Sequence, residues 1–184
     1  MKTPLLPVLF LFVLASGLSA QTCREVVRDS SGRIVQTIER QKQAGGAERA
    51  VTREASGRIT GTAATRPNAG GSAHTEYRDA SGRITGTAST RPTTGSSSQT
   101  TYRDAGGRMT GGADTRTSTG TGDCTQYRDA SGRITGTTTT GGNPAGKVTG
   151  IHRDASGRVT GTSSGSGKCQ KPAPVPLPPS SAKS

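Results

Sequence analysis

The chain has 184 residues, a formal net charge of +12 and few aromatic side chains: three Tyr, two Phe and no Trp. Glycine, serine and threonine dominate, so little apolar area is available to offset the conformational entropy that is lost on folding. This composition excludes a large single hydrophobic core. The chain is expected either to form a thin, repetitive β structure or to remain largely mobile.

Residues 1–20 have the layout of a secretory signal peptide. Lys2 supplies a positive start, residues 5–14 form an apolar run interrupted by Pro7, and residues 16–20 offer small side chains to a signal peptidase. The apolar run is too short for the alternative, a permanent membrane anchor. We expect cleavage near Ala20 and a mature protein without a membrane span. It would be bacterial, secreted or periplasmic, and able to associate with the cell surface.

Residues 21–168 are predicted to form one domain of six 25-residue repeats. In each copy an arginine is followed four residues later by a glycine, and that glycine is followed directly by a second arginine. The first arginines are Arg28, Arg53, Arg78, Arg103, Arg128 and Arg153, and the second are Arg33, Arg58, Arg83, Arg108, Arg133 and Arg158. Six copies with unchanged spacing indicate one structural unit that recurs along the chain.

Each repeat predicts a β-hairpin, because Thr, Tyr and Ile favour strands and the intervening Asp-Ala-Ser-Gly segment favours a turn. Two registers are open. A type I turn with a glycine bulge would place Asp79 opposite Arg83, whereas a tighter two-residue turn would place Tyr77 opposite Gly86. The second register is favoured because it gathers Tyr77, Ile84 and Gly86 on one apolar face. A one-residue slip would exchange the two faces.

The predicted fold class is all-β: a tandem array of six antiparallel β-hairpins, solenoid-like or joined into a spiral sheet. One stripe of side chains would be Val27, Thr52, Tyr77, Tyr102, Tyr127 and His152, and a second would be Ile34, Ile59, Ile84, Met109, Ile134 and Val159. Segments between hairpins, such as residues 89–99, predict flexible linkers. Pro67 and Pro92 are expected to end second strands, and residues 169–184 to form a Pro-rich disordered tail.

Residues 77–84 read Tyr-Arg-Asp-Ala-Ser-Gly-Arg-Ile and resemble the YD repeat of Rhs-type bacterial proteins. That family's pattern is a tyrosine, an aspartate, two variable residues, a glycine, an arginine and an aliphatic residue. Residues 102–109 and 127–134 match it equally well, and this chain inserts an arginine between the tyrosine and the aspartate. In the family such hairpins join into long spiral sheets that can enclose a toxin. Six units are too few for a shell, so the resemblance implies hairpins and surface association only.

Three cysteines are present: Cys23, Cys124 and Cys169. An exported chain meets an oxidising compartment, so one disulfide is expected. Cys23 with Cys169 would tie the two ends of the array together, and Cys124 with Cys169 is the rival pairing. No metal site is expected, because the cysteines are far apart and His74 and His152 do not accompany them at ligand spacing.

Catalysis is not expected, and neither is a cofactor. His74 and His152 are the two histidines of the chain, and His152 stands in the tyrosine column. The acids form a column of their own: Asp29, Glu54, Asp79, Asp104, Asp129 and Asp154. Each acid lies between two arginines of its hairpin, which predicts a turn residue and charge partner more readily than an acid–base catalyst.

The arginines carry the strongest functional signal. Twelve arginines of the repeat accompany the six acids, and Arg66, Arg91 and Arg116 add a partial third column. Such a face suits a polyanion, for instance an acidic polysaccharide of the cell envelope. Nucleic acid is less favoured, because three tyrosines offer little stacking. We expect a non-enzymatic protein that binds an anionic surface or polymer. The alternative is a structural or adhesive cell-surface module that acts by protein contacts.

Overall fold

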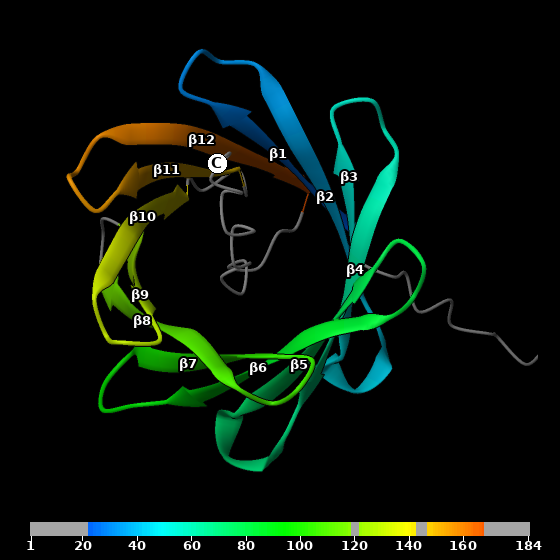
Figure 1. Cartoon of the computed structure of the whole chain (residues 1–184), viewed down its shortest axis with the longest axis vertical. Helices are drawn as coiled ribbons and strands as arrows, with labels where there is room; N and C mark the ends of the chain where they lie inside the picture. The colour runs from blue at the N-terminus through cyan, green and yellow to red at the C-terminus, as the bar shows by residue number, and fades with distance from the viewer. Residues whose placement is uncertain (1–21, 119–121, 143–146, 168–184) are drawn as a thin grey trace, which may run out of the picture.

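The computed structural model describes residues 22–118, 122–142 and 147–167, which form twelve antiparallel strands (Figure 1). The strands are β1 (Thr22–Asp29), β2 (Ile34–Lys42), β3 (Glu48–Glu54), β4 (Ile59–Pro67), β5 (Ala73–Asp79), β6 (Ile84–Pro92), β7 (Ser97–Asp104), β8 (Met109–Ser118), β9 (Gly122–Asp129), β10 (Ile134–Gly142), β11 (Val148–Asp154) and β12 (Val159–Gly167). The expected signal peptide and Pro-rich tail lie outside the described residues. Each strand pairs with the next in sequence, which confirms the prediction of antiparallel hairpins.

The sheet closes on itself, because β1 pairs with β12 as well as with β2. The seam runs from Cys23 opposite Gly167 to Asp29 opposite Gly161. The expectation of an open solenoid or spiral array was therefore wrong: the molecule is a closed barrel. Closure gives partners to the backbone groups of the first and last strands, which an open array would leave as exposed edges.

The segments expected to be flexible linkers are mostly strand. β4 continues to Pro67 and β5 begins at Ala73, so residues 68–72 alone connect them. Threonine accounts for the difference, because it is a good strand residue. The Oγ1 atoms of Thr65 and Thr75 lie 2.8 Å apart across β4 and β5. The predicted strand ends are confirmed, since β4 ends at Pro67 and β6 at Pro92.

Two short connections contain single 3-10 turns, η1 (Ala44–Gly46) and η2 (Ala69–Gly71). The second is closed by a hydrogen bond of 2.8 Å from Asn68 N to Ser72 O. In the described part of the chain, no helix has the length and apolar character needed to cross a membrane.

The hairpin register combines the two alternatives. Asp79 N donates to Arg83 O at 2.9 Å, as expected for a type I turn with a glycine bulge. A second bulge at Thr85 then shifts the register, and Tyr77 lies opposite Gly86, as expected for the other alternative. One turn and one bulge in series therefore produce both pairings.

The single apolar face that favoured the second register is not formed. Tyr77 pairs with Gly86, and both belong to the side that lines the barrel. Ile84 pairs instead with Arg78 and is exposed on the outer wall. The tyrosine column thus faces the interior and the isoleucine column faces solvent.

The apolar interior consists of two small clusters. One contains Val27, Ile38 and Ala50, and the other contains Ala88, Tyr102 and Ala113 with Tyr77 and Tyr127 packed against it. Tyr102 is the largest side chain among these buried residues and is 7 % exposed. Burial raises the pKa of Tyr77 to about 12. All three tyrosines therefore belong to the second cluster.

A charged group lies inside the barrel beside these clusters. Arg40 Nη2 lies 3.4 Å from Glu25 Oε2, and Arg40 Nη1 lies 3.2 Å from Glu48 Oε1. The Arg40 side chain is 7 % exposed, and its buried Nε atom has no hydrogen-bond partner among the described residues. The strands β1, β2 and β3 thus share one buried arginine between two carboxylates.

Glycines allow neighbouring strands to approach closely on the inner side. A Cβ atom on Gly136 would lie 2.5 Å from the carbonyl oxygen of Arg153 in β11. Equivalent clashes with backbone carbonyl oxygens occur at Gly61, Gly86, Gly111 and Gly161. Because backbone atoms of a closed sheet cannot easily move aside, glycine is required here for packing.

Replacing Gly136 by alanine is expected to lower the free energy of unfolding by about 1–3 kcal/mol, because the new methyl group overpacks the sheet. The matched control is Gly106→Ala, since a Cβ there would lie 3.4 Å from Asp104 Oδ1, the end of a side chain. Urea denaturation followed by circular dichroism measures both. Equal stability of the two variants would contradict the close approach.

Candidate functional site

All six tight turns lie at one end of the barrel, because each joins an odd-numbered strand to the following even-numbered strand. In the first turn, Asp29 N donates to Arg33 O at 2.9 Å and Gly32 N donates to Asp29 O at 3.0 Å. Gly32 has a φ of 84°, which glycine adopts without strain. The other five turns repeat this pattern. The six turns, which recur every 25 residues in the sequence, therefore form a ring at one end of the barrel.

The acids of the ring mainly accept hydrogen bonds from their own turns. Asp29 Oδ1 accepts from Ser31 Oγ at 2.6 Å, from Ser31 N at 2.9 Å and from Arg33 N at 3.0 Å. The Ser31 hydroxyl bond is the main cause that lowers the pKa of Asp29. Asp79 and Asp154 make the same contacts. The predicted turn role is present in these residues.

Ion pairing within the turns is much rarer than expected. In the described residues, Glu54 alone among the six acids pairs with an arginine side chain, and it lies 3.0 Å from Arg58 Nε. In the described part of the chain, the other five acids make no ion pair with the arginines of their own turns. Three of the first arginines pair instead with carboxylates of the strands: Arg53 with Glu39, Arg78 with Glu76, and Arg128 with Asp114. The arginines are therefore less neutralised than their alternation with acids suggests.

The first arginine of each repeat folds over its own turn. Its Nη1 atom donates to the carbonyl oxygen of the turn glycine, for example at 2.7 Å from Arg78 to Gly82. We call these six the capping arginines: Arg28, Arg53, Arg78, Arg103, Arg128 and Arg153. One nitrogen stabilises the turn, and in Arg78 and Arg128 the other nitrogens contact Glu76 and Asp114.

The second arginine of each repeat is exposed at the tip of the hairpin. We call these six the arginine crown: Arg33, Arg58, Arg83, Arg108, Arg133 and Arg158. Arg58, which has the ion pair with Glu54, is still 77 % exposed. In the described part of the chain, the side chains of the other five make no hydrogen bond or ion pair. The crown is thus a ring of guanidinium groups that are available to a ligand.

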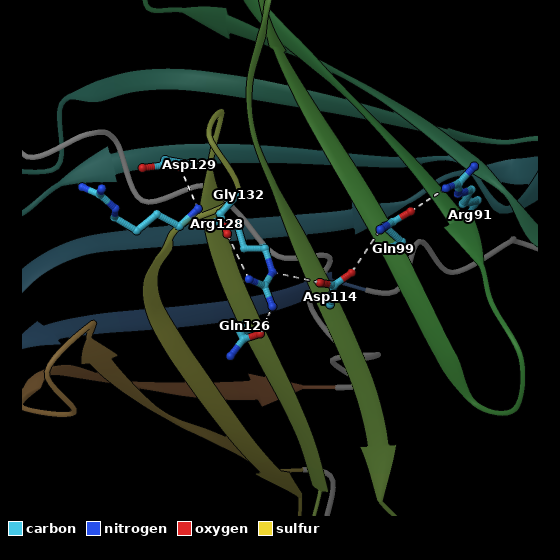
Figure 2. Close-up of polar contacts among 8 residues, drawn as sticks. Arg91, Gln99, Asp114, Gln126, Arg128, Asp129 and Gly132 are labelled. Carbon is cyan, nitrogen blue, oxygen red and sulfur yellow. Dashed lines mark hydrogen bonds and ion pairs between the residues drawn. The ribbon is translucent and has the colours of Figure 1, made fainter.

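A polar network on the outer wall fixes one of the capping arginines (Figure 2). Arg128 Nε lies 3.4 Å from Asp114 Oδ2, and Arg128 Nη2 donates to Gln126 Oε1 at 2.6 Å. Gln99 links the other oxygen of Asp114 to Arg91, through bonds of 3.3 and 2.6 Å. The network joins strands β6 to β9 and holds Arg128 against the wall.

The turn end as a whole carries a surplus of six positive charges, because twelve arginines accompany six acids. Arg66, Arg91 and Arg116 lie toward the opposite ends of β4, β6 and β8. The structure therefore brings together the two main arginine columns and separates the third from them. A concentrated field of one sign attracts ligands of opposite charge.

Other candidate groups do not gather into a site. His152 is half-buried, with Nδ1 2.9 Å from Thr138 Oγ1, and burial lowers its pKa. His74 is exposed on β5. Among the described residues, no three His, Cys, Asp or Glu side chains could together hold a metal ion.

Cys23 is disulfide-bonded and Cys124 has a free, exposed thiol. Cys169 lies outside the described residues. The pairing of Cys23 with Cys169 stays a prediction, for which peptide mapping of the unreduced protein is the direct check.

The buried group of Glu25, Arg40 and Glu48 was missed by sequence reasoning. A signal was present, because Arg40 occupies the repeat position that is threonine at Thr65, Thr90, Thr115 and Thr140. A charged residue at a position that is otherwise threonine indicates that its contacts differ from those of the other repeats. Here Arg40 forms ion pairs inside the barrel.

Comparison with protein-family models gives no match, and comparison with curated proteins gives no significant relative. The resemblance to the YD repeat stays a prediction.

Proposed function

We propose that this protein is exported, is not an enzyme, and binds an acidic polysaccharide, or another polyanion of the cell envelope, through the arginine crown. The observation that carries the proposal is the ring of exposed guanidinium groups, five of which lack a hydrogen bond or ion pair in the described residues. A polyanion offers many charges at regular spacing, which suits a ring of equivalent cations. Binding releases counterions and is therefore sensitive to salt.

The repetition itself supports a binding role. A catalytic centre needs one set of groups with distinct tasks, whereas the six turns are nearly identical. Six weak contacts on one rigid frame can act together, so that moderate affinity per arginine becomes strong attachment. The barrel would serve as that frame.

The test is heparin binding by the mature protein, measured by calorimetry across a range of salt concentrations. The crown variant carries Arg83→Gln, Arg108→Gln and Arg133→Gln. The matched control carries Arg66→Gln, Arg91→Gln and Arg116→Gln, which removes the same charge from the other end of the barrel. The crown variant is expected to bind at least about tenfold more weakly, with a salt slope smaller by about three, and the control much less affected.

Equal losses in the two variants would show that net charge alone attracts heparin, and would contradict a specific role for the crown. If neither the original protein nor the two variants bound heparin, the proposal would be rejected. Self-association that is independent of salt would then favour the alternative, a structural or adhesive module.

A further inference from the structure

A ring of exposed aliphatic side chains lies just behind the arginine crown. Its members, which we call the aliphatic belt, are Ile34, Ile59, Ile84, Met109, Ile134 and Val159. The first five are 37–45 % exposed, and Val159 is half-buried. In a chain with so few large apolar residues, six of them at one height on the outer wall are not explained by the core.

Each belt residue pairs across its hairpin with a capping arginine. Arg78 lies opposite Ile84, and Arg103 lies opposite Met109, with the same register in the other four hairpins. Aliphatic and guanidinium groups therefore alternate around the whole circumference of the turn end. The crown arginine directly precedes each belt residue in sequence, so every apolar contact point has two cations beside it.

We propose that the turn end docks on a lipid surface that carries anionic phosphate headgroups. The proposal rests on the proposed function and makes it narrower. A fully hydrated polysaccharide gains nothing from the aliphatic belt. A lipid surface offers both matching chemistries: phosphate oxygens for the guanidinium groups, and the upper acyl region for isoleucine and methionine.

The shape of the turn end agrees with a flat partner. The six turns have the same length and hydrogen bonds, so they end at one level around the closed sheet. Arginine side chains are long and keep their charge among the headgroups while their stems and the adjacent aliphatic groups reach less polar depth. Six such points can touch one surface together, which raises the overall affinity without further contacts.

The test compares heparin with vesicles made of equal parts phosphatidylglycerol and phosphatidylcholine, and with pure phosphatidylcholine vesicles. The belt variant carries Ile84→Ser and Ile134→Ser. The matched control carries Val51→Ser and Ile151→Ser, which removes two aliphatic groups from the outer wall away from the belt. Vesicle cosedimentation and heparin calorimetry are measured on each protein.

The original protein is expected to bind the anionic vesicles and not the neutral ones. The belt variant should bind the anionic vesicles about tenfold more weakly, while its heparin affinity, which also reports correct folding, is unchanged. The control should keep both. Heparin binding without vesicle binding, or equal vesicle binding by the belt variant and the original, would overturn the lipid proposal and leave the proposed function standing. If the original protein bound neither heparin nor the anionic vesicles, both proposals would be rejected.

Discussion

Replacing Arg40 by methionine is expected to lower the free energy of unfolding by about 3–5 kcal/mol, because the change leaves two carboxylates inside the barrel without their cation. Arg40 lies 3.4 Å from Glu25 and 3.2 Å from Glu48, and its side chain is 7 % exposed. The Glu25 and Glu48 side chains are only 13 % and 22 % exposed, so water compensates them in part. Urea denaturation at neutral pH measures the loss.

The control for this prediction removes the whole charged group. The triple variant Glu25→Gln, Arg40→Met and Glu48→Gln has no uncompensated charge, so most of the lost stability should return. If the single and triple variants are equally unstable, the loss comes from packing, and the assignment of a buried ion pair would be contradicted.

Replacing Tyr102 by alanine is expected to lower the free energy of unfolding by about 3–5 kcal/mol, because the ring is at the centre of the second apolar cluster. Met109 belongs to the same repeat and faces the outer wall at 45 % exposure. Met109→Ala should therefore cost less than about 1 kcal/mol. The two residues were predicted to share one face, so the comparison tests the observed separation of the two columns.

Both variants are measured by urea denaturation under the same conditions. Similar losses at Tyr102 and Met109 would mean that the isoleucine column is buried after all. That result would also weaken the lipid proposal, which needs the belt to be free.

Much of the local structure was readable from the sequence, because it depends on neighbouring residues. The Asp-Ala-Ser-Gly turn, the strands around it and the strand ends at Pro67 and Pro92 follow from turn chemistry and strand preference. The prediction that the threonine-rich segments are flexible linkers was wrong. Their strand structure depends on contacts between strands, such as that of Thr65 with Thr75.

The hairpin register depends on two bulges, one in the turn and one in the second strand. The glycine bulge at Gly82 and the second bulge at Thr85 each move the pairing by one residue. A register that includes only one of the two bulges places some side chains on the wrong face of the sheet. Ile84 was placed inside with Tyr77 for this reason, although it lies outside beside Arg78.

Closure could not be predicted, because it depends on contacts between the two ends of the chain. β1 and β12 are separated by nearly the whole domain, and no local pattern states that they pair. The arginine columns and the turn role of the acids could be predicted from the sequence. The assembly of the arginines into a ring could not, because it depends on closure of the barrel.

The most direct test of barrel closure is amide hydrogen exchange of the mature protein, resolved by strand with mass spectrometry. In a closed barrel the strands β1 and β12 bond to each other and have no free edge. We predict that their amides are protected as strongly as those of the hairpins β5–β6 and β7–β8. Rapid exchange in β1 and β12 beside protected central hairpins would mean an open array, and would remove the ring on which the proposed function depends.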